Sequence, residues 1–575
     1  MRRLLVLPTV ALVFLFLQGS LVAQSVNVLT WHENNWRSGA NTAETLLTTS
    51  NVVDSKFGKV CSVPTDGNVY AQPLIVINVP FTVNGVTTTH TVGYAVTEND
   101  SVYAFDANTC ALLKSVSMVP VITGCTAGVT CEQPVDCHYI GGGGCQTIAP
   151  TVGILGTPAI DLASDTLYLV AETQVGSGTN ISAWIHRIHA LDIRSLAEKT
   201  GSPAAISGSA GSNAFISQHQ IQRAALLVLD GVGPQGHDMV YVSFSLMDGT
   251  PEKLGFKPPG WIFGFDGTNL GSQPTGLPYI FTTTPTGVGP DGPGGGIWQA
   301  SAGPSAGFGS ASDPTTYIFV GTGDGTWDAG NGGNNYADSF LKLTPSLQVA
   351  DFFTRYNEPM YDDADEDYGS GGMMLVPDNT IPAHPYISVN IGKDGNVYVV
   401  DRGSPGGYNG DSDTNLQTVA GKYPYLSTPA YWNGHLYDAN LGNSMKSWHV
   451  AASCNPGPVC TTGMMATTQK FIYGATPAVS SNGTVAGTGI VWAVNSPNQV
   501  SGGSPAVLYA FDALTLKALY GSNQCGAQDR AGLAVKFVVP TVANGKVYIG
   551  TQNQVDVYGE LTTTRTCSTK LTTEE

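Results

Sequence analysis

The stretch Val102-Tyr103-Ala104-Phe105-Asp106 decides the fold, because it recurs along the chain. Its β-branched and aromatic residues, closed by an Asp, are typical of a short strand that ends in a turn. Counting this stretch, the sequence holds eight copies of one strand. The other clear copies are Ile188–Asp192, Ile262–Asp266, Val397–Asp401 and Leu508–Asp512, and the weaker ones are Phe340–Leu343, Met445–Trp448 and Val555–Tyr558.

The spacing of the copies indicates a repeating β-sheet unit. From Phe105 to Val557, equivalent positions are 86, 74, 78, 57, 48, 63 and 46 residues apart. The shortest steps fit the roughly 40–50 residues of a four-stranded propeller blade, and the longer ones indicate loop insertions. Helical periodicity is nearly absent, and a second strand with a Pro at its start, such as Thr157-Pro158, precedes most copies. Since one such sheet cannot bury both faces, the blades must pack radially.

The sequence therefore predicts an all-β protein, an eight-bladed β-propeller of four-stranded antiparallel blades. The last copy ends at Gly559 without room for an outer strand, whereas Phe57–Val63 stands alone before the first blade. We expect this N-terminal strand to complete the last blade and close the ring.

The ends of the chain differ from the propeller, which we place at residues 24–561. Met1–Ala23 begins with two arginines, continues with the apolar run Leu4–Leu17 and ends in small residues, as a secretory signal peptide does. The apolar run has about 14 residues, fewer than the ~20 of a membrane-spanning helix. We expect export to the periplasm or the outside of the cell without membrane insertion, and a polar disordered tail over Thr562–Glu575.

Charge and cysteine content narrow the function classes further. The chain has 25 Lys and Arg against 43 Asp and Glu, a net charge of −18, which argues against nucleic acid as a partner. Ten cysteines in an exported chain predict disulfides. Two groups of cysteines, Cys125 to Cys145 and the pair Cys454 and Cys460, have spacings of six, six and eight residues, which favour loop staples over zinc sites.

The repeat motif resembles that of a known superfamily. Tyr103-Ala104-Phe105-Asp106-Ala107-Asn108-Thr109 and Tyr509-Ala510-Phe511-Asp512-Ala513-Leu514-Thr515 look like the blade motif of pyrroloquinoline quinone (PQQ) propellers, the quinoprotein alcohol dehydrogenase-like superfamily. The resemblance covers nearly the whole chain and implies an eight-bladed propeller with PQQ and Ca²⁺ in its central channel. Non-catalytic eight-bladed scaffolds share the same repeats.

Gly294-Gly295-Gly296-Ile297-Trp298 resembles the Gly-rich segment that presents a Trp to the quinone in these dehydrogenases. The resemblance implies that Trp298 binds the cofactor, because an indole stacks well on a flat tricyclic ring. The alternative is a Trp that only packs between blades.

Gly321-Thr322-Gly323-Asp324 resembles the family segment Gly-Thr-Gly-Asn, whose side-chain oxygen binds calcium. Asp324 takes the place of the Asn, and a carboxylate is also a hard oxygen ligand for Ca²⁺. The alternative is an Asx-turn that caps a hairpin.

The acidic stretch Asp362–Asp367 before Tyr368, followed by Lys393 and a strand that ends Asp401-Arg402, resembles the family's catalytic region. By this match Asp367 is the general base, close enough to the cation to be a metal ligand, and Lys393 is the cation beside the quinone carbonyls. A nearby metal keeps Asp367 ionised, so that it can take an alcohol proton, and Lys393 can stabilise negative charge on the reduced ring. The alternatives are a solvated acidic loop and a structural Ca²⁺ site.

The sequence also departs from the family pattern. It has no Cys-Cys dipeptide, whose disulfide covers the quinone in alcohol-oxidising members, so another residue has to cover a bound ring. Tyr70 stands where the family often has an acidic or amide side chain. A second calcium carboxylate is expected before Trp298, where Asp248 and Glu252 are the acidic candidates.

Together these features favour an exported quinoprotein-like dehydrogenase that oxidises an alcohol, polyol or sugar. The haem attachment pattern is absent, so electrons would pass to a separate acceptor. One alternative is a non-catalytic propeller that binds a protein or a glycan. Another is a carbohydrate-cleaving propeller with Asp365 and Asp367 as acid and base. The dehydrogenase hypothesis requires Trp298, Asp324, Asp367 and Lys393 to converge at the hub.

Overall fold

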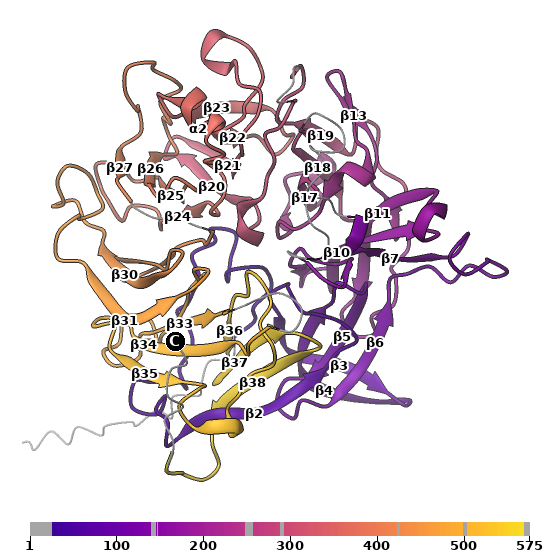
Figure 1. Ribbon diagram of the computed structural model, residues 1–575, viewed down its shortest axis with the longest axis vertical. Helices are drawn as coiled ribbons and strands as arrows, with labels where there is room; N and C mark the ends of the chain where they lie inside the picture. The colour runs from indigo at the N-terminus through magenta and orange to yellow at the C-terminus, as the bar shows by residue number, and fades with distance from the viewer. Residues whose placement is uncertain are drawn as a thin grey trace, which may run out of the picture.

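The computed structural model describes residues 26–139, 145, 148–247, 257–287, 292–421, 426–497 and 503–567. Its strands form eight antiparallel sheets arranged around a ring, as the sequence predicts (Figure 1). The expected signal peptide, residues 1–23, lies outside the described residues. Among the residues described, no helix has the length and apolar character needed to cross a membrane.

The first four blades contain the longest insertions. Blade one is β3 (Leu74–Val83), β4 (Val86–Val96), β5 (Ser101–Asp106) and β6 (Leu112–Ser117), and blade two is β9 (Ala159–Asp161), β10 (Thr166–Val175), β11 (Ala183–Asp192) and β12 (Ala204–Ala205), extended by β7 (Glu132–Asp136) and β8 (Thr151–Val152). Blade three is β15 (Gln220–Ile221), β16 (Leu227–Leu229), β17 (Met239–Leu246), β18 (Trp261–Asp266) and β19 (Tyr279–Thr282), and blade four is β20 (Ser305–Ser310), β21 (Asp313–Gly321), β22 (Ser339–Leu343) and β23 (Val349–Thr354).

The last four blades are more regular. Blade five is β24 (Met374–Leu375), β25 (Ile387–Ile391), β26 (Val397–Asp401) and β27 (Gln417–Val419), and blade six is β28 (Ala430–Trp432), β29 (His435–Asp438), β30 (Asn443–His449) and β31 (Met465–Phe471). Blade seven is β32 (Ala478–Ser480), β33 (Ile490–Asn495), β34 (Val507–Asp512) and β35 (Ala518–Gly521), joined in parallel by β1 (Ala40–Asn41), and blade eight is β36 (Thr541–Ala543), β37 (Lys546–Thr551), β38 (Gln554–Glu560) and β2 (Phe57–Pro64).

Short elements decorate the loops between these strands. The described α-helix is α2 (Glu358–Asp363), and a small hairpin pairs β13 (Ser209–Ala210) with β14 (Asn213–Ala214). The 3₁₀ helices are η1 (Cys137–Tyr139), η2 (Gly178–Asn180), η3 (Ser217–His219), η4 (Pro234–Gly236), η5 (Gln299–Ser301), η6 (Ala329–Asn331) and η7 (Gly526–Gln528).

All eight repeat copies are the third strands of their blades, which confirms the reading of the repeat. The Asp at the end of the motif stabilises the turn that follows the third strand. One carboxylate oxygen of Asp106 accepts the backbone N–H groups of Asn108 at 2.9 Å and Thr109 at 2.8 Å, and Asp512 does the same for the turn after β34. These Asx-turns reverse the chain toward the outer strand.

The ring closes where the two ends of the propeller meet. β2 pairs antiparallel with β38, with Gly58 opposite Gly559, so the first long strand completes the sheet formed by the last three (Figure 1). A disulfide between Cys61 and Cys110 also ties β2 to the turn that precedes β6 of blade one. Blade eight therefore contains strands from both ends of the propeller, and the disulfide links it to blade one.

Five disulfides use all ten cysteines. The pairs Cys125–Cys131, Cys137–Cys145 and Cys454–Cys460 close small loops, which confirms the loop staples. The pair Cys525–Cys567 corrects the expected tail boundary, because it holds residues 562–567 against the propeller together with the ion pair between Arg565 and buried Asp529. Residues 568–575 lie outside the described part of the chain.

One hydrogen bond recurs at five of the eight junctions between neighbouring blades. A buried tyrosine on the second strand of a blade donates its hydroxyl to a backbone carbonyl in the turn after the third strand of the next blade. Tyr94 donates to Ile193 at 2.6 Å, and Tyr437 donates to Ala513 at 2.9 Å. The other tyrosines of this set are Tyr168, Tyr241 and Tyr548.

We predict that Tyr94→Phe destabilises the propeller by about 1–2 kcal/mol, because the carbonyl of Ile193 loses its partner inside a dry interface. Urea unfolding followed by circular dichroism measures the change. Tyr356→Phe, at a residue 40% exposed, is the control and should leave the midpoint unchanged. Equal midpoints for the wild type and Tyr94→Phe would remove the hydroxyl from this role.

Candidate functional site

A cavity of about 510 Å³ lies where loops from several blades meet. Its walls come from blades three, four and five and from the segments that lead into blades six and eight, and blades four and eight lie opposite each other in the ring. Residues from blades that lie opposite each other can line one cavity only near the central axis of the ring. The structure brings all four residues selected from the sequence into this lining, which consists of Arg223, Leu246, Lys257, Trp298, Ala300, Asp324, Asp365, Asp367, Ser370, Lys393, Leu426, Lys536 and Phe537.

Trp298 reaches the cavity through a tightly packed glycine segment. Gly294 bridges to Gly325 of the next blade, and a Cβ at Gly294 would lie 2.5 Å from the carbonyl oxygen of Asp324. The three residues that follow Trp298 (Gln299–Ser301) all have positive φ, which non-glycine residues adopt rarely and mainly at functional sites. The Trp298 ring also packs against the core cluster that includes Tyr70.

Asp324 is held in place by its own backbone and by a lysine. Its N–H donates to Asp367 Oδ1 at 2.9 Å, and its carboxylate forms an ion pair with Lys257. The close approach requires Gly323, where a Cβ would lie 2.4 Å from Asp367 Oδ1. The Asp324 carboxylate accepts its hydrogen bond from Lys257, which lines the same cavity, and not from a backbone N–H of an Asx-turn.

Three carboxylates converge beside Trp298. One oxygen from each of Asp324, Asp365 and Asp367 lies within 4.8 Å of the other two. Lys393 Nζ lies 2.7 Å from Asp365 Oδ2 and 3.5 Å from Asp367 Oδ2. The sequence analysis did not select Asp365 as a metal ligand, although its place two residues before Asp367 was the available signal. Asp365 is exposed and Asp367 is buried, so only part of the acidic stretch is a solvated loop.

The protonation of this group follows from its surroundings. Burial, together with the negative charge of Asp324, raises the pKa of Asp367 to about 6, although the positive charge of Lys393 opposes the rise. Burial lowers the pKa of Lys393, but Asp367 and Asp365 outweigh that effect and raise the pKa above its ordinary value. Three carboxylates against the two ammonium groups of Lys257 and Lys393 leave an excess of negative charge.

The donor set fits a hard cation. Carboxylate oxygens are the ligands that Ca²⁺ prefers, and three of them already lie close enough to share one ion. Lys257 and Lys393 are the present counter-charges, and both have flexible side chains that can turn toward another anion. Asp248 and Glu252, the expected further carboxylates, lie outside the described residues.

Cations are concentrated at this cavity. The whole chain has 25 Lys and Arg, and among the residues that the structure describes four of them line this cavity: Arg223, Lys257, Lys393 and Lys536. In a protein with a net charge of −18, such a cluster beside two aromatic rings suits a flat ligand that carries negative groups. Lys257, Lys536 and Phe537 were missed in the sequence, because they lie in loops that carry no repeat motif.

Tyr70 serves the structure of the loop next to the cavity. Its ring is buried, and its hydroxyl accepts the N–H of Ala149 at 3.2 Å. Burial raises the pKa of Tyr70 to about 12, so the hydroxyl stays neutral. It therefore cannot supply the charge of an acidic side chain at this position.

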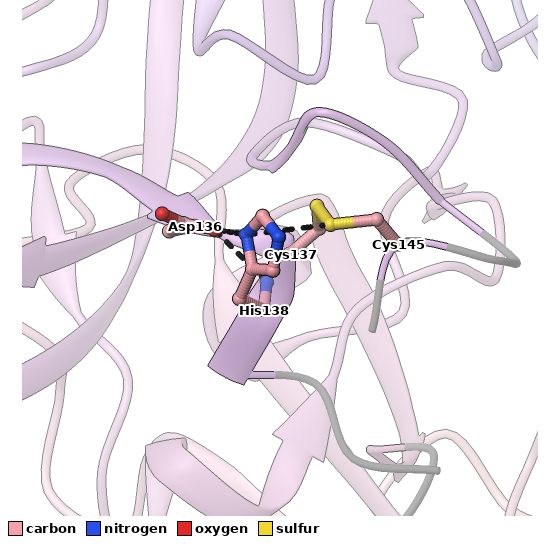
Figure 2. Close-up of side chains that lie close together, drawn as sticks. All are labelled: Asp136, Cys137, His138 and Cys145. Carbon is pink, nitrogen blue, oxygen red and sulfur yellow. Dashed lines mark hydrogen bonds and ion pairs between the residues drawn. A yellow bond between two sulfur atoms is a disulfide. The ribbon is translucent and has the colours of Figure 1, made fainter. Parts of the chain in front are cut away.

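A second cluster of candidate metal ligands lies on the insertion of blade two (Figure 2). Its members are Asp136, Cys137, His138 and Cys145, but the two cysteines are joined in a disulfide. His138 Nδ1 lies 2.7 Å from Asp136 Oδ1 and 3.6 Å from Cys145 Sγ. With no thiolate available, this cluster is a loop staple with an exposed His–Asp pair.

A set of three acids is buried between blades one and two. Glu98, Asp100 and Glu172 are at most 1% exposed, and among the residues that the structure describes no hydrogen-bond partner is found for their carboxylate oxygens. Glu172 approaches His186 Nε2 at 3.2 Å without hydrogen-bond geometry. Burial raises the pKa of Glu98 to about 9 and also raises the pKa of the other two, which lie in each other's field.

We predict that the protein loses stability as the pH rises from about 5 to 9. Between the unfolded pKa of Glu98, 4.5, and its folded pKa of about 9, the native state holds a proton that the unfolded chain has released. Thermal unfolding at pH 5.5, 7 and 8.5 measures the slope. Glu98→Gln should flatten it, whereas Glu560→Gln at an exposed residue should not. A midpoint that rises with pH would contradict this assignment.

Comparison with known proteins places the fold. No protein-family model matches the chain, and no curated protein matches its sequence. Among solved structures, the quinohemoprotein alcohol dehydrogenase from Comamonas testosteroni is similar over 94% of this chain and 82% of its own, with 14% identity and a TM-score of 0.57. A europium-containing methanol dehydrogenase is similar over 93% of this chain and 98% of its own, with 14% identity and a TM-score of 0.54. A quinohemoprotein alcohol dehydrogenase from Pseudomonas putida is similar over 96% of this chain and 82% of its own, with 13% identity and a TM-score of 0.56.

The chain has the quinoprotein-like propeller fold. At these identities the likeness extends to the fold alone. Within this quinoprotein-like propeller, the residues that the resemblance singled out line one cavity near the axis.

Proposed function

We propose that this protein is an exported quinoprotein-like dehydrogenase that oxidises an alcohol, polyol or sugar with PQQ and Ca²⁺ in the central cavity. One observation carries the proposal: Trp298, Asp324, Asp367 and Lys393, selected from four separate stretches of sequence, line one cavity of about 510 Å³. The fold shared with two quinohemoprotein alcohol dehydrogenases supports it. Five disulfides support export, since disulfides persist in oxidising compartments.

The residues of the cavity fit both cofactors. Asp324, Asp365 and Asp367 would hold the metal, and Trp298 would offer its indole face to the quinone. The similar methanol dehydrogenase is described as containing europium, and three carboxylates would also suit a trivalent ion. When bound, PQQ supplies an electrophilic carbonyl carbon that accepts hydride from the substrate.

Asp367 would act as the general base. The N–H of Asp324 holds Oδ1 at 2.9 Å, which leaves Oδ2 to take the hydroxyl proton of the substrate. A metal ion against this carboxylate lowers its pKa, so the group would be ionised at neutral pH. Lys393 Nζ lies 3.5 Å from Oδ2. Its ammonium group would stabilise the quinone oxygen that becomes negative when the ring accepts hydride.

The geometry favours this reaction over glycoside cleavage. Retaining glycosidases hold their two carboxyl groups about 5–5.5 Å apart and inverting ones about 6.5–9.5 Å apart. In this protein carboxylate oxygens of Asp365 and Asp367 lie within 4.8 Å, and Lys393 contacts both carboxylates. The positive charge of Lys393 opposes the rise in the pKa of Asp367 and so favours the ionised form of this group over the protonated form that a general acid needs.

We predict that the mature protein, loaded with PQQ and Ca²⁺, reduces an artificial electron acceptor with some alcohol, polyol or sugar. Asp367→Asn should lower the rate at least about 100-fold while PQQ still binds, because it removes the base and keeps the shape. Asp411→Asn, on an exposed loop, is the matched control and should leave the rate unchanged.

Two results would contradict the proposal. An unchanged rate in Asp367→Asn would remove this residue from the role of base. The absence of PQQ binding by the wild type at micromolar concentration would replace the dehydrogenase with the non-catalytic propeller that binds a protein or a glycan.

A further inference from the structure

Phe537 forms part of the wall between two cavities. It lies in the segment before β36, and it lines both the central cavity and a neighbouring cavity of about 280 Å³. Leu426 and Lys536 line the same two cavities. A ring with open space beside it can present a flat face to a ligand.

The backbone of Phe537 is held in a conformation that aromatic residues avoid. Its φ is 63°, in the left-handed region where the Cβ of a bulky residue is crowded. Such conformations persist where the surroundings enforce them, and they gather at ligand sites. On the other side of the cavity, the segment after Trp298 is strained in the same way. Both rings therefore lie on or directly beside backbone in the left-handed region.

Arg223 connects the two rings. The central carbon of its guanidinium lies 3.9 Å from the ring centre of Phe537 and 5.6 Å from that of Trp298, so the ring centres are at most 9.5 Å apart. A flat ligand between two rings needs about 7–8 Å, since each stacked layer takes about 3.5–4 Å. The distance limit permits one flat ligand between the rings.

We propose that Trp298 and Phe537 form the two faces of a slot for one flat anionic ring, and that Arg223 binds the negative groups of that ring. This inference rests on the proposed binding of PQQ. It assigns to Phe537 the covering role that no Cys-Cys dipeptide can fill in this chain. The guanidinium turns from the face of Phe537 to a carboxylate of the ligand, where charge-assisted hydrogen bonds are stronger than the cation–π contact.

Calorimetric titration of the mature protein with PQQ and with methyl-esterified PQQ tests the two roles separately. Phe537→Ala should weaken both ligands about tenfold or more, because both lose a stacking face. Phe537→Tyr keeps a flat ring and should bind like the wild type. Arg223→Ala should weaken PQQ about 10- to 100-fold and leave the ester nearly unchanged, because only PQQ carries the negative groups.

Controls separate these effects from misfolding. Phe308→Ala, at an exposed residue outside both cavities, should bind as the wild type does. If Phe537→Ala lowers the unfolding midpoint, Phe537→Leu retains an apolar side chain without the flat face and should still weaken both ligands.

The inference is overturned if Phe537→Ala and Phe537→Leu bind PQQ as tightly as the wild type, or if Arg223→Ala weakens PQQ and its ester equally. These failures differ from a failure of the proposed function, in which the wild type itself binds no PQQ.

Discussion

The hydrogen bond from a buried tyrosine of one blade to the turn of the next is the constraint on which the site depends. It fixes five of the eight blades against the next through a backbone carbonyl, so the angle between these blades does not rest on apolar packing alone. The pairing of β2 with β38 then closes the ring, and Tyr548 extends the same hydrogen bond from blade eight to blade one. A closed ring brings loops from opposite blades to one axis, which no single blade could do.

Charge balance shapes the cavity that this ring creates. Carboxylates taken out of water need a nearby positive charge, and Lys257 and Lys393 supply it to the buried residues Asp324 and Asp367. Lys393 also pairs with the exposed Asp365. The same lysines can exchange these partners for an anionic ligand when a metal ion takes the carboxylates. Glu98, Asp100 and Glu172 differ from this group, because burial is the largest effect on each of them and raises the pKa of each carboxyl group.

The repeated strands and the glycine-rich segments were predictable from the sequence, whereas residues in loops without a pattern were not. The third strands and their Asx-turns were recognisable because every blade needs the same backbone geometry, and the orphan strand Phe57–Val63 was recognisable from the missing outer strand of the last blade. Trp298 and Asp324 were found because their glycine-rich segments resemble a family pattern, and the structure shows that close packing requires these glycines. Phe537 and Lys257 come from loops whose path is set by the ring as a whole, so no local pattern marks them. Residues 562–567 were expected to be disordered because they are polar, yet Cys567 and Arg565 hold them in place.

The most direct test of the central claim is a crystal structure of the mature protein grown with PQQ and Ca²⁺. We predict electron density for a flat ring against Trp298, and for an ion between Asp324, Asp365 and Asp367. A structure at saturating ligand concentration that shows the ring on the rim of the propeller, or shows no ring in this cavity, would contradict the account.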